Sequence, residues 1–219
     1  MKIFLAICIL SVFLLGTFHV AHADGKLNVS AVNPKTNNQF FGFQVVEVSV
    51  DDPAKSSTST PQTEPSVTIN GMKLRMVQAT DGKWYAYFAD RSFAQLADSY
   101  ALTAGKGTDF GEFCSSTSGV ASVGVDTSQT VGIAIPRPYV GAQSSSNGNN
   151  PISTCSGGSI SSGAQINHVV RSPTSPSPLN GGQIGILPNS FPFIQLYNFN
   201  PTGNVIIDYT DGTPQRVTL

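Results

Sequence analysis

The sequence predicts an all-β fold, an immunoglobulin-like β-sandwich with long Ser/Gly/Pro loops and one short helix. Short runs of β-branched and aromatic residues recur at close spacing, with Gly or Pro turns between them. The 219 residues include 21 Gly and 14 Pro but only 3 Glu and 7 Lys, a composition that disfavours a helix-rich protein. The Cys-Trp-Cys order of true immunoglobulin domains is absent, because Trp84 precedes both Cys114 and Cys155.

Residues 1–23 have the pattern of a secretory signal peptide. Lys2 precedes an apolar run over 3–15 that is too short to span a bilayer, and Ala21-His22-Ala23 forms an A-x-A cleavage site. An uncleaved anchor is the alternative. Since no later segment is apolar enough to cross a membrane, we expect an exported mature chain without a transmembrane span.

The mature chain divides into two parts in this interpretation. Residues 24–66 would supply N-terminal strands, with alternation clearest over 43–50, followed by a Pro/Ser/Thr linker or exposed loop over 52–66. Residues 67–219 would form the β-sandwich domain. The last predicted strand, residues 215–219, reaches the final residue, so we expect a domain cut short at its C-terminus or an edge strand completed by Leu219.

The best-defined strands follow residue 66. Residues 67–72 and 74–78 are predicted strands around a Gly turn, and Asp81-Gly82 indicates a hairpin that leads into a strand over 83–89. Alternation there puts Trp84 on one face and Tyr85 and Tyr87 on the other, so we expect both faces to be covered. A carbohydrate-stacking platform of these three aromatic residues is the functional alternative to core packing.

The predicted helix covers residues 92–98. Ser92 and Gln95 have capping-box spacing, and Phe93 and Leu96 share an apolar face. Strands are then predicted over 120–125, 131–135, 184–187, 193–199 and 205–209, with Ser/Gly/Pro loops over 141–163 and 172–182.

Charge and histidine content exclude several functions. The 12 basic and 13 acidic residues form no basic cluster for nucleic acid. His168 is the one histidine outside the signal segment, which is too few for zinc or copper, and no serine elbow accompanies it. We therefore predict no catalytic residue.

Three carboxylates are candidates for a calcium site, the one cofactor we consider. Asp98, Asp109 and Glu112 follow Asp90 within a short stretch, and calcium prefers oxygen ligands. Their spacing matches no specific calcium loop, so capping and turn formation are the alternative, and a glycosidase-type pair is a further one.

Two covalent features are predicted for an exported chain. Cys114 and Cys155 would form a disulfide, with two separate thiols as the alternative. Asn28 begins the N-glycosylation sequon Asn28-Val29-Ser30.

Several blocks of the sequence resemble surface-layer (S-layer) proteins of ammonia-oxidising archaea. They cover residues 74–91, 93–99, 109–114 and 194–205. The resemblance implies a secreted, often glycosylated immunoglobulin-like module that packs with like subunits into a lattice coating the cell. Members of that family are longer, with several β-domains in series, so the chain would be an N-terminal portion or a short relative. No catalytic residues carry over from a structural family.

The function predicted from the sequence is thus a structural cell-surface subunit or segment of an S-layer lattice. The alternative is a secreted carbohydrate- or ligand-binding β-module.

Overall fold

The computed structural model describes residues 25–59, 62–100, 110, 112–114, 123, 127–135 and 192–219, without the side chains of 98–100 and 112. Its strands are β1 (Lys26–Val29), β2 (Val46–Asp51), β3 (Val67–Ile69), β4 (Met72–Leu74), β5 (Val77–Gln78), β6 (Trp84–Asp90), β7 (Glu112–Cys114), β8 (Gly132–Ile135), β9 (Ile194–Tyr197), β10 (Asn204–Tyr209) and β11 (Gln215–Thr218). The helix α2 (Arg91–Tyr100) and the 3-10 turns η1 (Pro34–Thr36) and η2 (Pro53–Lys55) complete the described elements.

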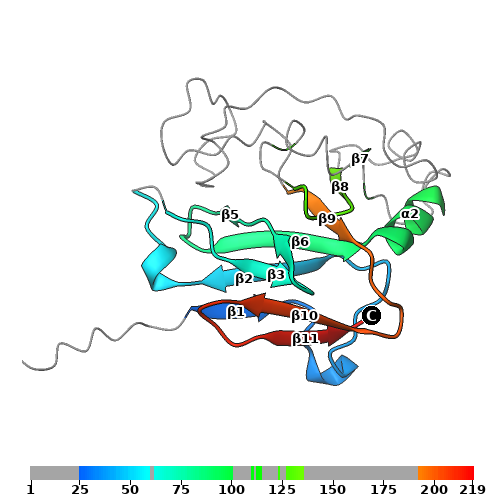
Figure 1. Cartoon of the computed structure of the whole chain (residues 1–219), viewed down its shortest axis with the longest axis horizontal. Helices are drawn as coiled ribbons and strands as arrows, with labels where there is room; N and C mark the ends of the chain where they lie inside the picture. Colours follow the sequence, from blue (N-terminus) through cyan, green and yellow to red (C-terminus); the bar gives the residue numbers. More distant parts are fainter. Residues whose placement is uncertain are drawn as a thin grey trace, which may run out of the picture.

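These strands form two sheets, which confirms the all-β prediction. One sheet has the order β1-β2-β6-β9-β8-β7, and the other has the order β11-β10-β3-β4. In Figure 1, β10 and β11 run below β2 and β6. The strand β6 is central: β2 pairs antiparallel along one edge, while β5 and the parallel strand β9 share the other edge.

The main core lies between the two sheets. Val46, Val48 and Val50 of β2 alternate with more exposed neighbours, as a strand with one buried face requires. They pack in one cluster with buried residues of the opposite sheet, including Ile69 and Ile207. Fully burying each such side chain is worth about 1.5–3 kcal/mol, so this repeated alternation stabilises the sandwich.

A second core covers the outer face of the first sheet. Ala94 and Ala97 of α2 pack there with Phe110, Phe113 and Leu196. Figure 1 shows α2 directly beyond the end of β6. The expectation that both faces of the 83–89 strand are covered is confirmed near this helix, where Tyr87 packs against the second core.

The predicted capping box is wrong. The helix begins at Arg91, and the carboxylate of Asp90 accepts the Phe93 backbone N–H at 2.9 Å. Its other oxygen accepts the Phe199 N–H at 3.0 Å, and Asp90 is only 2% exposed. Asp90 therefore closes β6, begins α2 and fixes the chain after β9, leaving Ser92 outside the cap.

The described residues of the 24–66 segment are closely joined to the rest. The strands β1 and β2 lie in the same sheet as β6, so both sides of residue 66 contribute to one sheet. The stretch predicted as an exposed linker has buried acidic residues near its ends, Asp52 and Glu64. The predicted strand over 74–78 is interrupted after Leu74, where the chain passes from one sheet to the other.

Some predicted elements cannot be placed. The loops over 141–163 and 172–182 and the strand over 184–187 lie outside the described residues. The strand over 120–125 also lies outside them apart from Val123, which is helical where a strand was predicted. The strand β7 was not predicted. Within the described part of the chain, no helix has the length and apolar character needed to cross a membrane.

Candidate functional site

The exposed edge of β4 is closed by side chains from distant parts of the chain. The hairpin β3–β4 turns through Asn70 and Gly71, both with positive φ (49° and 81°), as a two-residue type I′ turn requires. Lys73 pairs with Thr68 next to the closing pair, which directs its backbone groups away from β3. Gln129 Oε1 accepts the Lys73 N–H at 2.6 Å, and the Tyr197 hydroxyl donates to the Lys73 carbonyl at 2.9 Å.

Gln195 plays the same part for the next outward-facing residue. Its Oε1 accepts the Arg75 N–H at 2.8 Å, and its Nε2 donates to the Arg75 carbonyl at 2.8 Å. Gln195 is completely buried. One amide side chain of β9 thus reproduces the pair of hydrogen bonds that a neighbouring strand would make, and the edge offers fewer groups for pairing with another chain.

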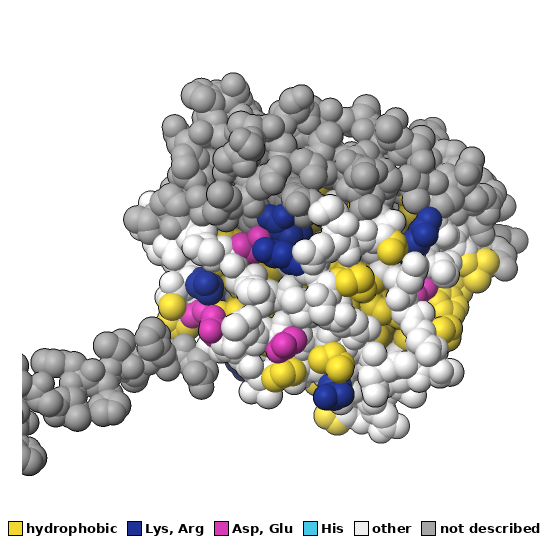
Figure 2. All heavy atoms as spheres, in the orientation of Figure 1, with side chains coloured by type: hydrophobic (Ala, Val, Ile, Leu, Met, Phe, Trp, Pro, Cys, Tyr) yellow, Lys and Arg dark blue, Asp and Glu magenta, His cyan; other side chains and the backbone are white. Residues whose placement is uncertain are grey.

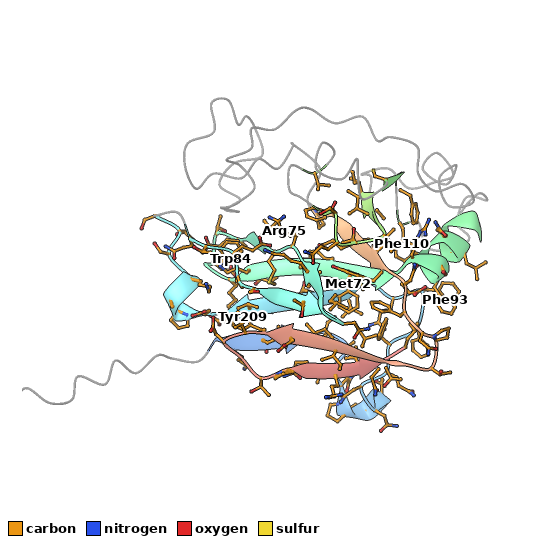
Figure 3. All side chains as sticks on the ribbon, in the orientation of Figure 1. Met72, Arg75, Trp84, Phe93, Phe110 and Tyr209 are labelled. Atoms are coloured by element: carbon orange, nitrogen blue, oxygen red, sulfur yellow. The ribbon has the colours of Figure 1, made fainter. Side chains whose placement is uncertain are left out.

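A buried ion pair lies beside this edge. Arg75 Nε donates to both oxygens of Glu64, at 3.1 and 3.0 Å, and the Met76 N–H donates to Glu64 Oε1 at 2.6 Å. The Glu64 and Arg75 side chains are 5% and 7% exposed, so their charges need each other as partners. Lys73 Nζ lies 3.8 Å from Glu64 Oε2, and the Lys73 side chain is 41% exposed. Figure 3 places Arg75 above β6, between β5 and β9 in this view.

A small cavity opens between these charges and the turn before β8. Its volume is about 30 Å³, and it is lined by Lys73, Arg75, Thr127, Ser128 and Gln129. Thr127 is 1% exposed, and its Oγ1 has no hydrogen-bond partner in the structure. Figure 2 shows Lys and Arg side chains gathered beside an acidic side chain on this face. We call this group of five lining residues the β4-edge pocket.

A second buried polar contact joins the two sheets directly after the last residue of β2. The Tyr209 hydroxyl donates to Asp52 Oδ2 at 2.5 Å, and Asp52 Oδ1 accepts the Ala54 N–H at 2.8 Å. Burial and the Asp52 carboxylate raise the pKa of Tyr209 well above its usual range. A Cβ on Gly25 would lie 2.6 Å from Tyr209 Cε1, so only glycine lets the start of β1 pack on this ring. The contact is structural, since it holds β10 to the end of β2.

The predicted calcium ligands are not brought together by any described geometry. Asp109 and the side chains of Asp98 and Glu112 lie outside the described residues, so a calcium site stays a prediction. Among the residues that are described, no three His, Cys, Asp or Glu side chains could hold a metal ion together. Asp90, which the sequence groups with these carboxylates, caps α2 instead.

The structure describes some of the residues named in the two covalent predictions. Cys114 is completely buried on β7, while Cys155 lies outside the described residues, as does His168, so the disulfide stays a prediction. Asn28 is exposed on the edge strand β1. The Ser30 hydroxyl accepts the Glu47 N–H at 2.9 Å, which fixes the third residue of the sequon against β2.

The three-residue aromatic platform is wrong, because its members lie on opposite faces. Trp84 is completely buried in the core and donates Nε1–H to the Lys55 carbonyl at 2.9 Å. Tyr85 lies on the outer face, with its hydroxyl 2.8 Å from Asp81 Oδ2. That hydrogen bond, together with desolvation, raises the pKa of Tyr85 to about 12.

The residues of the β4-edge pocket and their buried neighbours Glu64 and Gln195 were missed by sequence reasoning. One signal was present: Gln195 interrupts a run of apolar residues at a position that strand alternation directs into the core. A buried amide needs partners, so its presence there indicates a polar contact across the sheets. Glu64 and Thr127 gave no such signal, because they stand in loop-like sequence.

Comparison with known proteins adds no family assignment. No protein-family model matches the chain, and no curated protein matches it. The resemblance to S-layer proteins therefore stays a prediction.

Proposed function

We propose that the chain is a structural cell-surface module that associates side by side with like subunits in an S-layer lattice. An exposed aromatic patch supports this proposal. Among the described residues, the exposed large hydrophobic side chains are Phe41 (77%), Phe43 (44%) and Leu96 (44%). The rings of Phe43 and Phe93 pack edge-on, with 5.6 Å between their centroids, which joins the loop before β2 to α2. We call Phe41, Phe43, Phe93 and Leu96 the α2-end patch. Figure 2 shows hydrophobic side chains at this end of the molecule.

The chemistry of the patch suits contact between proteins. Aromatic residues are enriched and charged residues depleted at the centres of interfaces, and a group of exposed apolar side chains marks an interaction site more strongly than scattered ones. The chain also has few charges, 11% of its residues, so like subunits approach with little repulsion. A second copy is therefore the partner that we propose.

The buried polar groups suit a rigid building unit. Asp52 joins the end of β2 to β10, Asp90 joins α2 to the chain after β9, and Glu64 joins its loop to the β4–β5 crossing. Asp52 and Asp90 each join elements more than a hundred positions apart, and Glu64 joins segments 12 positions apart. Such ties resist deformation of the sandwich, which a load-carrying coat requires.

The finer features of this proposal come from the sequence. They are an immunoglobulin-like strand arrangement and export after removal of residues 1–23. The Cys114–Cys155 disulfide, a glycan on Asn28, and calcium held by Asp98, Asp109 and Glu112 would further stabilise an extracellular module.

Association of the full chain tests the proposal. Sedimentation velocity across a concentration series, with electron microscopy of envelopes from expressing cells, should show self-association and ordered arrays. The double variant Phe41→Ser, Phe43→Ser should weaken association at least about tenfold, because it removes the centre of the patch. Tyr85→Ser, which removes an aromatic ring from β6, is the matched control and should associate normally. A chain that stays monomeric at every concentration and forms no arrays would overturn the proposal.

A carbohydrate- or ligand-binding β-module is the second candidate. The outer-face rings of Tyr85 and Tyr87 are partly exposed on adjacent outward positions of β6, which favours it. Binding of the full chain to a glycan array, lost in Tyr85→Ala, would support this function, and binding to no glycan would remove it.

A further inference from the structure

Among the described residues, the lining of the β4-edge pocket includes two cationic side chains, Lys73 and Arg75, and no acidic one. Lys73 and Arg75 both lie within 4 Å of the single Glu64 carboxylate, at 3.8 and 3.0 Å. The Arg75 and Glu64 side chains are buried and bonded to each other, whereas Lys73 lies farther from that carboxylate and its side chain is 41% exposed at the cavity wall. Removing charge from water favours a counter-charge nearby, so the pocket favours an anion over a cation.

The hydroxyl of Thr127 supplies a second, independent observation. It is buried and has no hydrogen-bond partner in the structure, and Thr127 lines the cavity. A buried hydroxyl without a partner is destabilising, so a group that accepts its hydrogen would be stabilising there. The nearby Gln129 amide is held in place by its bond to the Lys73 N–H, which keeps the wall polar.

We propose that the β4-edge pocket binds a small oxyanion, the carboxylate or phosphate group of a ligand. An oxygen of that group accepts the hydrogen bond of Thr127, and its charge pairs with Lys73. A single water needs about 10–15 Å³, so a cavity of about 30 Å³ takes two oxygen atoms. The remainder of the ligand lies toward solvent at Lys73 and Gln129, both of which have exposed parts. This proposal does not depend on the lattice function.

The first experiment is calorimetric titration of the full chain with sodium phosphate and, separately, with sodium acetate, at constant ionic strength set by chloride. The expected result is one saturable site with a Kd of about 1 mM for at least one of them. Saturation by phosphate alone assigns a phosphate-bearing ligand, and saturation by acetate alone assigns a carboxylate. Heat from neither anion up to about 50 mM overturns the proposal and leaves ordered water as the occupant.

Variants locate the site. Lys73→Gln should weaken binding about tenfold, because it removes the charge that the anion meets. Lys83→Gln is the matched control: Lys83 is 43% exposed, close to the 41% of Lys73, and it too pairs with a carboxylate, that of Asp51 at 3.1 Å. Equal weakening by both variants would show general screening and overturn the assignment.

Thr127→Val separates binding from folding. Because the hydroxyl has no partner in the free protein, the valine variant should unfold at the same denaturant concentration or a higher one when the anion is absent. It should nevertheless bind the anion about tenfold more weakly, and Thr127→Ser should restore binding. A valine variant with unchanged affinity would exclude Thr127 as a ligand and refute the proposed geometry.

Discussion

Replacing Gln195 with Leu tests the closed β4 edge most directly. Leucine has nearly the volume of glutamine, so the core stays filled, but both hydrogen bonds to Arg75 are lost. The Arg75 N–H and C=O would then lie in the interior without these partners. Water cannot replace the amide easily, because Gln195 is completely buried.

The expected destabilisation follows from the two stranded groups. Each buried donor or acceptor left unsatisfied costs about 1–3 kcal/mol, and because the two groups belong to one residue, we expect about 3 kcal/mol in total. That is a large fraction of the roughly 5–15 kcal/mol that stabilises a typical domain. For a chain of this size it corresponds to a fall in Tm of about 10 °C.

Urea denaturation followed by Trp84 fluorescence measures the effect, since this residue lies in the core. Tyr197→Phe removes one hydrogen bond, to the Lys73 carbonyl, and should cost about 1 kcal/mol, which makes a graded series. The control is Gln44→Leu at an exposed position, with an expected change within about 0.5 kcal/mol. A Gln195→Leu loss no larger than that of the control, at an unchanged m-value, would refute the idea that this amide holds the edge.

Three further outcomes are expected. Asp90→Ala should lower the free energy of unfolding by about 3 kcal/mol, because it removes the helix cap and the acceptor of the Phe199 N–H. Ser92→Ala should change it by less than about 0.5 kcal/mol. A larger loss for Ser92→Ala than for Asp90→Ala in urea melts would support the predicted capping box instead. Spectrophotometric titration should give Tyr85 a pKa of about 12, and Asp81→Asn should lower it toward the usual value near 10. Because the folded pKa is the higher one, the stabilisation from this tyrosine is complete below about pH 10 and is lost between about pH 10 and 12; an unshifted titration would contradict the Asp81 contact. Thiol assays on the mature protein should find no free thiol and one in Cys114→Ser, and two in the unaltered protein would exclude the bridge to Cys155.

Local rules were sufficient for most strands that are described. The β-branched runs and the Asp81-Gly82 turn gave β6 and β10 close to their observed bounds, whereas the strand predicted over 67–72 spans the Asn70-Gly71 turn between β3 and β4. They were insufficient at the β4–β5 crossing, where apolar residues continue through Met76 while the backbone leaves one sheet for the other. Alternation reports which face of a strand is buried, and carries no information about which sheet the strand joins.

Capping shows the same limit at a helix end. Ser92 has the residue type and spacing of a cap, yet Asp90 is used. Asp90 is the favoured cap because its second oxygen accepts the Phe199 N–H, from more than a hundred positions away in sequence. A carboxylate that satisfies one buried and one part-buried donor outweighs a hydroxyl that could satisfy one.

The all-β character, the alternating core of β2 and β6, and the low charge of the chain follow from residue type and a period of two, so local pattern was enough to predict them. The β4-edge pocket and the closed edge beside it depend instead on long-range contacts. Gln195 and Arg75 are 120 positions apart, and Lys73 and Gln129 are 56 apart. Such pairs come into contact only when the strands have paired in their final order. That order follows from the need to bury both faces of the first sheet.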